Sequence, residues 1–201
     1  MRIIFVRHAE PDYANDTLTE KGWREAALLA ERVSGWDVTD FYVSPLGRAR
    51  DTASLSLKKM GRTAEIFDWL REFHGPVNDP TRGENVIPWD FYPEYWTKIP
   101  DMYDKDGFGN TEVMKSGRVM EEYVRISGEL DALLAKYGYV REGGLYRTGK
   151  TEGAAHDATI VLFCHMGVTL FLCSHLLGIS PVVLTSGFFL APASVTVLAS
   201  E

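Results

Sequence analysis

Two histidines in this sequence each come directly after a short apolar run, and one of them has an arginine beside it. Residues 3–6 lead into Arg7 and His8, and residues 159–164 lead into His165. A neutral imidazole can attack phosphorus at physiological pH if a hydrogen bond fixes its other ring nitrogen. An adjacent guanidinium can bind the oxygens of the same phosphoryl group. His8 is therefore a candidate nucleophile for phosphoryl transfer, and a histidine that merely ends a strand is the alternative.

The elements that position these residues can be read from the pattern of apolar side chains. β-branched and aromatic runs predict buried strands at 3–6, 40–43, 64–67 and 159–164, and a last strand at 194–198. Apolar residues at helical spacing predict helices that end at Gly35, Gly61, Gly138 and Gly178. The alternation of strands and helices predicts a parallel sheet with right-handed crossovers. We expect a three-layer α/β/α fold with a mostly parallel central sheet.

Two helix starts carry capping signals. Thr19 precedes the first helix, and a Ser44-Pro45 pair precedes the second. Serine and threonine side chains accept hydrogen bonds from the first amides of a helix, and proline is favoured at the first helical position. We therefore predict Thr19 and Ser44 as N-cap residues.

The chain is expected to form a single domain over residues 1–201, with two additions. Residues at about 73–112 contain five prolines and eight aromatic residues but no sustained period, which predicts an inserted cap. This cap either shapes the substrate site or only covers one edge of the sheet. A glycine pair at 143–144 predicts a β-hairpin at about 139–157.

The predicted topology brings four chemistry-bearing positions to one edge of the sheet. His8 and His165 follow strands, Arg48 lies in the first turn of the second helix, and Glu72 follows the third strand. Ligands of open α/β sheets bind beyond the carboxyl ends of the strands. Together with Arg7, this edge would hold two imidazoles, two guanidiniums and a carboxylate, a set that suits an anionic phosphoryl group.

Composition narrows the range of partners. The net charge of −7 argues against nucleic acid or an anionic membrane surface as the main partner. The longest apolar stretch, 161–177, is interrupted by histidines and is too short to span a membrane. Arg7 and His8 interrupt the first apolar run too early for a signal peptide, so a cytoplasmic protein is expected. The expected partner is a small phosphorylated substrate, and the sequence leaves the oligomeric state open.

The sequence resembles the histidine phosphatase superfamily, also called the phosphoglycerate mutase-like family. The motifs that carry this resemblance lie in family order over most of the chain: Val-Arg-His-Ala-Glu at 6–10, Leu-Thr-Glu-Lys-Gly at 18–22, Ser-Pro-Leu-Gly-Arg-Ala-Arg-Asp-Thr-Ala at 44–53, Leu-Arg-Glu at 70–72, Cys-His-Met-Gly-Val at 164–168 and Ala-Ser-Val-Thr-Val-Leu at 193–198. The family's fold agrees with the fold expected from the pattern.

The resemblance implies a phosphohistidine mechanism. His8 would be the nucleophile, and Glu72 would be the general acid and then the base for water. The phosphate pocket would contain Arg7, Arg48 and His165, with His165 also counted as catalytic. Asn15 stands one place later than the asparagine common in the family and is the candidate substitute for that phosphate contact. Four other positions depart from the family: Ala9, Pro11, Ala14 and Met166.

We expect a phosphatase that hydrolyses a small phosphomonoester. The alternatives are a phosphoglycerate mutase-type phosphoryl isomerase and a non-catalytic protein that binds a phosphorylated ligand. The sequence ends three residues after Leu198, without the C-terminal tail of the mutases, and this favours hydrolysis. The candidate site has no clustered carboxylates for Mg²⁺, so we expect no metal and no cofactor.

Overall fold

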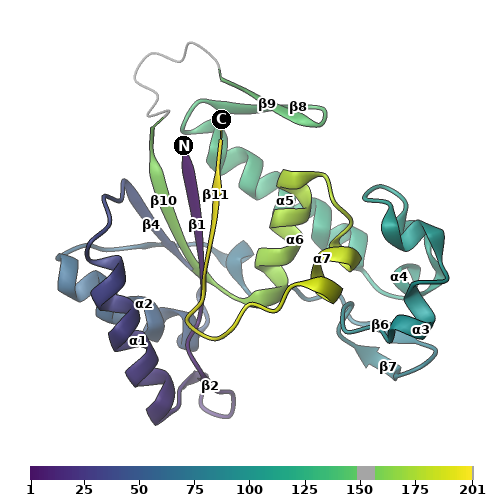
Figure 1. The fold of residues 1–201 in the computed structure, drawn as a ribbon, viewed down its shortest axis with the longest axis horizontal. Coiled ribbons are helices and arrows are strands. Elements are labelled where there is room, and N and C mark those ends of the chain that lie inside the picture. The colour runs from purple at the N-terminus through teal and green to yellow at the C-terminus, as the bar shows by residue number, and fades with distance from the viewer. Residues whose placement is uncertain (149–156, 201) are drawn as a thin grey trace.

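A five-stranded sheet forms the centre of the molecule, with the strand order β11–β1–β10–β4–β5 (Figure 1). The computed structural model describes residues 1–148 and 157–200. β1, β10, β4 and β5 run parallel, and β11 is antiparallel to β1, so the expected mostly parallel sheet is confirmed. The strands are β1 (Arg2–Arg7), β4 (Asp40–Val43), β5 (Glu65–Ile66), β10 (Thr159–Cys164) and β11 (Val195–Ala199).

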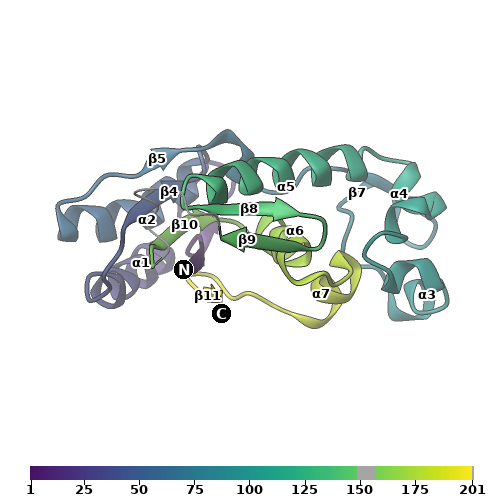
Figure 2. The ribbon, with the colours of Figure 1, turned by 90° about the horizontal axis from the view of Figure 1, so that it is seen from above.

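Helices cover both faces of the sheet, which gives the three layers visible in Figures 1 and 2. On one face lie α1 (Glu20–Val33) and α2 (Gly47–Met60), which pack against each other. On the other face lie α5 (Val119–Ala135) and α6 (Met166–Leu177). The short α7 (Pro181–Gly187) follows α6 and packs on it. The α/β/α class expected from the sequence is confirmed.

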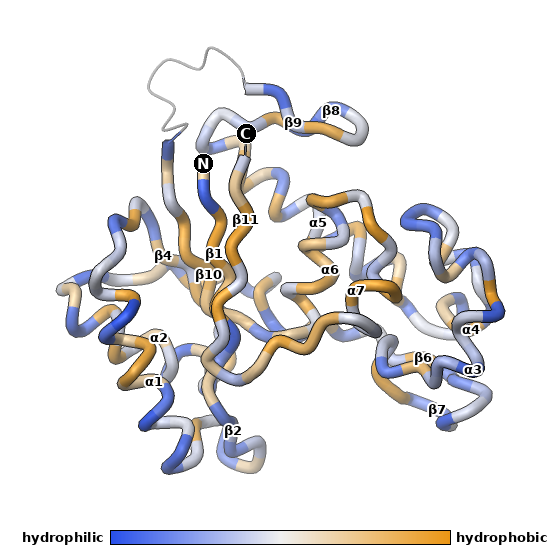
Figure 3. Tube along the Cα trace, in the orientation of Figure 1, coloured by the Kyte–Doolittle hydropathy of each residue, from blue (hydrophilic) through white to orange (hydrophobic). Residues whose placement is uncertain are grey.

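The apolar runs of β1 and β10 are explained by burial on both faces. Ile4 and Val6 belong to the cluster that contains α1 and α2, whereas Ile3 and Phe5 belong to the cluster that contains α5 and α6. Successive side chains of a strand point to opposite faces, so a strand between two helical layers needs an uninterrupted apolar run. Figure 3 shows these central strands as a hydrophobic band through the molecule.

α6 is apolar around its whole circumference because it is enclosed on all sides. Residues 167–174 are all buried, and the helix contacts β1, α5 and α7. An amphipathic pattern is therefore absent from this helix. Within residues 1–148 and 157–200, no helix has the length and apolar content needed to cross a membrane.

The insertion after the third strand forms a cap at one end of the molecule (Figures 1 and 2). It leaves the sheet through the 3₁₀ helix η1 (Asp68–Leu70). Its aromatic residues mostly serve packing: Trp89 and Phe91 are 5% and 4% exposed. Trp89 meets Phe171 of α6 edge to face, which holds the cap on the domain. Its elements are β6 (Val77–Asp79), β7 (Gly83–Val86), α3 (Pro93–Trp96), η2 (Pro100–Tyr103), η3 (Phe108–Asn110) and α4 (Glu112–Lys115).

Two hairpins complete the fold. β8 (Tyr139–Glu142) and β9 (Leu145–Thr148) pair antiparallel around Gly143, whose φ of +59° favours glycine. This hairpin lies within the range predicted from the sequence, and residues 149–156 of that range lie outside the described residues. The smaller hairpin of β2 (Pro11–Asp12) and β3 (Thr17–Leu18) follows His8 directly.

Candidate active site

His8 and His165 lie beside each other at the carboxyl ends of the adjacent strands β1 and β10. Arg7 pairs with Cys164 in the sheet register, so the next residue of each strand enters the same region. The two imidazole centroids are 5.1 Å apart, and the residues are 2% and 0% exposed. Two histidines separated by more than 150 positions in the chain thus share one buried site.

The orientation of the His8 ring is fixed by its own backbone neighbour. Its Nδ1 lies 2.8 Å from the carbonyl oxygen of Ala9. A carbonyl oxygen can only accept, so Nδ1 carries the hydrogen and Nε2 keeps its lone pair. The amide of Ala9 donates in turn to Thr52 of α2, at 2.9 Å, which anchors this turn to the helix. The geometry presents Nε2 as a nucleophilic atom.

His165 is held by Ser44, which corrects one prediction. The structure begins α2 at Gly47 with Leu46 as its N-cap and no side-chain cap, so the prediction of Ser44 as N-cap is wrong. Ser44 Oγ instead lies 2.8 Å from His165 Nε2. When the serine hydroxyl donates this bond, Nδ1 of His165 carries a hydrogen. That Nδ1 is buried and has no partner within the described part of the chain.

Arg7 and Arg48 bring two guanidiniums to the histidines, and both keep donors that are free to bind an anion. Nη1 of Arg7 donates to the carbonyl of Leu190, and Nη1 of Arg48 donates to Asp16 Oδ1 at 2.7 Å. The Nε atoms of both arginines are buried without a partner among the described residues. Buried donors are normally satisfied. These two Nε atoms are unfilled donors that suit an anion, and Nδ1 of His165 joins them in the tautomer in which Ser44 donates to Nε2.

Asp16 is a site residue that sequence reasoning missed. Besides Arg48, it accepts a hydrogen bond from the amide of Gly47 at 2.7 Å, so it caps the first turn of α2. Burial opposes its ionisation, but the Gly47 amide and the Arg48 guanidinium outweigh this and lower its pKa below the usual value. Its φ of +47°, a conformation that aspartate tolerates, turns its side chain toward α2. No spacing in the sequence signals a contact across 32 residues.

Glu72 lies against the first turn of α6. Its Oε1 accepts from the amides of Val168 at 3.0 Å and Phe73 at 2.8 Å. Burial raises the pKa of this carboxyl above its usual value, although these amides and the Arg48 charge act in the opposite direction. A carboxyl group with a raised pKa can carry a proton near neutral pH and donate it.

The close approach of Glu72 to α6 requires a glycine at position 167. A β-carbon there would lie 2.7 Å from Oε1 of Glu72 and 2.6 Å from the ring of Trp89. Real side chains do not tolerate such distances, so any substitution of Gly167 would displace the carboxyl group or the cap. The glycine of the Cys-His-Met-Gly-Val motif therefore serves the position of Glu72.

Asn15 and Glu10 have other partners. The side-chain amide of Asn15 donates to Asp12 Oδ2 at 2.7 Å on an exposed turn, and the structure does not bring it into contact with the histidines. Its phosphate contact therefore stays a prediction. Glu10, the other carboxylate near His8 in the sequence, accepts from Lys21 at 2.5 Å and from Thr19 at 2.9 Å. Thr19 also caps α1 as predicted, through the amide of Gly22.

Electrostatics keep both imidazoles neutral. Burial lowers the pKa of His8 to about 4, and the charges of Arg48 and Arg7 act in the same direction. Burial, again with Arg48, lowers the pKa of His165 to about 2. A neutral His8 has the lone pair that attack on phosphorus requires. The two arginines thus favour both the binding of an anion and the reactive form of the nucleophile.

These shifts predict how stability depends on pH. Unfolded histidine binds a proton near pH 6.5, whereas folded His165 stays neutral down to about pH 2, so stability falls as pH decreases below 6.5. Each such group steepens the fall by about 1.4 kcal/mol per pH unit. We expect His165→Gln to remove that contribution from urea-unfolding free energies measured between pH 4.5 and 6. The exposed His74 offers the control His74→Gln, which removes a histidine that is not part of the buried pair. Equal slopes in wild type and His165→Gln would contradict this account.

No metal-binding cluster accompanies these groups. Across the residues that the structure describes, no three histidine, cysteine, aspartate or glutamate side chains are arranged to hold a metal ion. The site's positive charge comes from guanidiniums, whose planar donor geometry matches phosphoryl oxygens.

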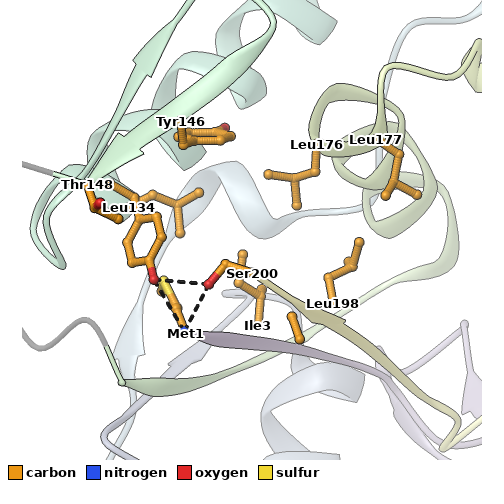
Figure 4. Close-up of a pocket in the computed structure, with 11 residues that line it drawn as sticks. Met1, Ile3, Leu134, Tyr146, Thr148, Leu176, Leu177, Leu198 and Ser200 are labelled. Carbon is orange, nitrogen blue, oxygen red and sulfur yellow. Dashed lines mark hydrogen bonds between the residues drawn. The ribbon is translucent and has the colours of Figure 1, made fainter.

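Two of the cavities outside the cluster of histidines differ in the charge of their lining residues. One, of about 350 Å³, has apolar walls that include Leu134, Leu176 and Leu198, and it lies at the amino end of β1, the opposite edge of the sheet (Figure 4). The other, of about 650 Å³, borders Glu72 and the start of α5. Its guanidiniums are paired with carboxylates, as in the bond of Arg118 Nε to Glu121 at 2.7 Å.

Comparison with known proteins identifies a family for this chain. Residues 3–126 match the model of the histidine phosphatase superfamily (branch 1). A probable phosphoglycerate mutase GpmB from Photorhabdus laumondii is 32% identical over 83 residues, which are 37% of this chain and 39% of that protein. A 2,3-bisphosphoglycerate-dependent phosphoglycerate mutase from Thermoplasma acidophilum is 40% identical over 62 residues, which are 26% of this chain and 31% of that protein. Each match therefore spans less than half of the curated relative.

Solved structures share the fold over nearly the whole chain. A mycobacterial glucosyl-3-phosphoglycerate phosphatase matches with a TM-score of 0.63 and 20% identity, over 98% of this chain and 92% of that one. A phosphoserine phosphatase mutant from Entamoeba histolytica matches with a TM-score of 0.59 and 19% identity, over 98% and 89%. At these identities the likeness concerns the fold. The family model covers more than half of the sequence, and the chain belongs to the histidine phosphatase superfamily.

Proposed function

We propose that this protein is a phosphatase that hydrolyses a small phosphomonoester through a phosphohistidine intermediate on His8, without a metal ion. In this proposal Arg7, Arg48 and His165 hold the phosphoryl group. Glu72 supplies the proton for the leaving oxygen.

The observation that carries the proposal is the state of the donors and acceptors around His8. The Ala9 carbonyl takes the hydrogen of Nδ1, which leaves Nε2 with a lone pair. Both arginines, whose charges act on His8, and the neighbouring His165 each have a buried nitrogen without a partner among the described residues. They suit the three oxygens of a phosphoryl group, and two guanidiniums can neutralise its charge. A merely structural histidine pair would not need buried arginine nitrogens without partners.

In the first step, Nε2 of His8 attacks phosphorus and forms the N–P bond. The bond from phosphorus to the ester oxygen breaks, and its electron pair goes to that oxygen. The protonated carboxyl of Glu72 gives its proton to this oxygen, so a neutral alcohol leaves and Glu72 becomes ionised. The amides of Val168 and Phe73 then stabilise the carboxylate.

In the second step, the Glu72 carboxylate takes a proton from water, and the water oxygen attacks phosphorus. The N–P bond breaks, inorganic phosphate leaves, and His8 regains its lone pair. Glu72 is protonated again, so the cycle ends with both residues in their starting states.

A phosphoglycerate mutase is the second candidate, because the curated relatives carry that name. A mutase would begin with the same transfer to histidine. It would then return the phosphoryl group to a hydroxyl of the glycerate rather than to water. The two reactions therefore differ in the acceptor and not in the residues described above.

A test of acceptor and metal dependence separates the candidates. We expect a panel of phosphomonoesters that includes 3-phosphoglycerate to release inorganic phosphate after exhaustive EDTA treatment, with little conversion to 2-phosphoglycerate. Free phosphate and both glycerate isomers would be measured in the same reactions.

Each other result has a defined meaning. Isomer exchange without hydrolysis would favour the mutase. Activity that disappears with EDTA and returns with a divalent ion would overturn the metal-free mechanism. Saturable binding of phosphomonoesters with no turnover on the whole panel would favour the non-catalytic binding protein.

A further inference from the structure

Two exposed aromatic rings lie over the two arginines of the candidate site. The Arg48 guanidinium carbon is 5.4 Å from the ring centroid of Tyr13, and that of Arg7 is 5.8 Å from the ring centroid of Phe189. Tyr13 belongs to the β2–β3 turn, and Phe189 belongs to the segment between α7 and β11. Loops far apart in the sequence thus place one ring on each guanidinium.

These rings are exposed, in contrast to Trp89 and Phe91 of the cap. Tyr13 is 69% and Phe189 is 76% exposed, whereas Trp89 and Phe91 are almost completely buried. Contact with a guanidinium accounts for only part of each ring's surface. Exposed apolar groups gathered at one place commonly mark a binding surface.

Met166 adds a third apolar side chain, beside Arg7. Its sulfur lies 3.8 Å from Nη1 of Arg7, and it stands where the family usually has glycine. A methionine adapts its shape to a bound ring and makes favourable sulfur–aromatic contacts. We call Tyr13, Met166 and Phe189 the collar.

We propose that the collar contacts the part of the substrate beyond the phosphoryl group and selects a phosphomonoester with an aromatic ring close to its ester oxygen. This inference rests on the proposed function and names the class of its substrate. A phosphoryl group held by Arg7 and Arg48 has the collar rings next to it, so a ring on the leaving group can stack there. In the cavity beside Glu72, by contrast, the guanidiniums are already paired with carboxylates, so they are not free to bind the substrate.

The experiment compares ligands that differ only in an aromatic ring. 2-Phenylethyl phosphate and ethyl phosphate both release primary alkoxides, so their intrinsic reactivity is similar. The corresponding phosphonates cannot be hydrolysed, and calorimetric titration would give their Kd values independently of turnover. Each ligand would be measured with wild type and with Tyr13→Ala/Phe189→Ala. Tyr13→Phe/Phe189→Tyr retains both rings, and Leu28→Ala removes an apolar side chain that is 73% exposed on α1.

We expect wild type to prefer the phenyl ligand by about tenfold or more, in Kd for the phosphonates and in KM for the esters. The double alanine variant should lose most of this preference, both in Kd for the phosphonates and in KM for the esters. The ring-retaining variant and Leu28→Ala should keep the preference.

Two results would overturn the inference. If the double alanine variant weakened both phosphonates equally, the rings would only hold the arginines in place. If wild type showed no preference for the phenyl ligand, the collar would not contact the leaving group. Discrimination between the phosphonates without hydrolysis of any ester would leave the inference standing and contradict the proposed phosphatase activity.

Discussion

Replacing His8 with alanine is expected to lower the rate of phosphate release by about 10⁴-fold or more, because the variant lacks the atom that accepts the phosphoryl group. Wild type quenched at neutral or alkaline pH during turnover should carry one added phosphoryl group on His8, detected by intact-mass and peptide analysis. Phosphohistidine is lost in acid, which is why the quench must avoid it. The alanine variant should show no such addition.

Two further variants make this result specific. His8→Asn can still donate a hydrogen bond to the Ala9 carbonyl but has no counterpart of Nε2, so it should be as inactive as alanine. His74→Ala removes an exposed histidine and should keep both activity and label. Near-normal turnover of either His8 variant would refute the covalent mechanism, provided that thermal unfolding shows an intact fold.

Replacing Glu72 with glutamine is expected to harm some substrates far more than others. A proton on the leaving oxygen matters most when the departing alkoxide is strongly basic. We therefore expect kcat/KM to fall by about 10²–10³-fold for an alkyl phosphate. For 4-nitrophenyl phosphate, whose leaving phenolate is stable without a proton, we expect a loss about tenfold smaller.

Glu10→Gln is the matched control for this prediction. Lys21, followed by Thr19, holds the pKa of Glu10 below its usual value, so this carboxylate is a poor proton donor. Its replacement should change kcat/KM by less than about twofold on either substrate. Equal losses on both substrates in Glu72→Gln would mean that Glu72 only shapes the site, and another acid would be needed.

The opposite pKa shifts of Glu72 and the histidines have one origin. Burial disfavours the charged form of every group, so it raises the pKa of the carboxyl and lowers the pKa of His8 and His165. A protonated acid and a neutral nucleophile are both uncharged. The buried site thus favours the pair of states from which the proposed reaction starts.

Local sequence patterns were sufficient for the framework of this protein. The apolar run before His8 predicts a strand buried on both faces, because only such a strand needs apolar residues at consecutive positions. A similar run before His165 predicts a second strand, and the structure pairs the two in parallel. The parallel sheet, the layers and the meeting of the two histidines therefore follow from short-range periodicity and the rule that ligands bind at carboxyl ends.

Contacts between distant segments were decided only by the tertiary structure. Ser44 looks like a helix cap in the sequence, but its hydroxyl forms a hydrogen bond with His165, 121 residues away. No local sequence pattern predicts that Asp16 accepts hydrogen bonds from Arg48 and the Gly47 amide. Such pairings depend on which loops the folded sheet brings together, and no local period encodes them.

The aromatic residues show most clearly the difference between what the sequence predicts and what the tertiary structure decides. Their abundance at about 73–112 is plain in the sequence, and it predicts a cap whose rings either pack or contact substrate. Burial of Trp89 and Phe91 assigns those rings to packing. Tyr13 and Phe189, isolated in the sequence, are the rings that the fold places on Arg48 and Arg7. Composition determined that aromatic surface exists, whereas the three-dimensional arrangement of loops decided which rings stay exposed beside the half-buried arginines.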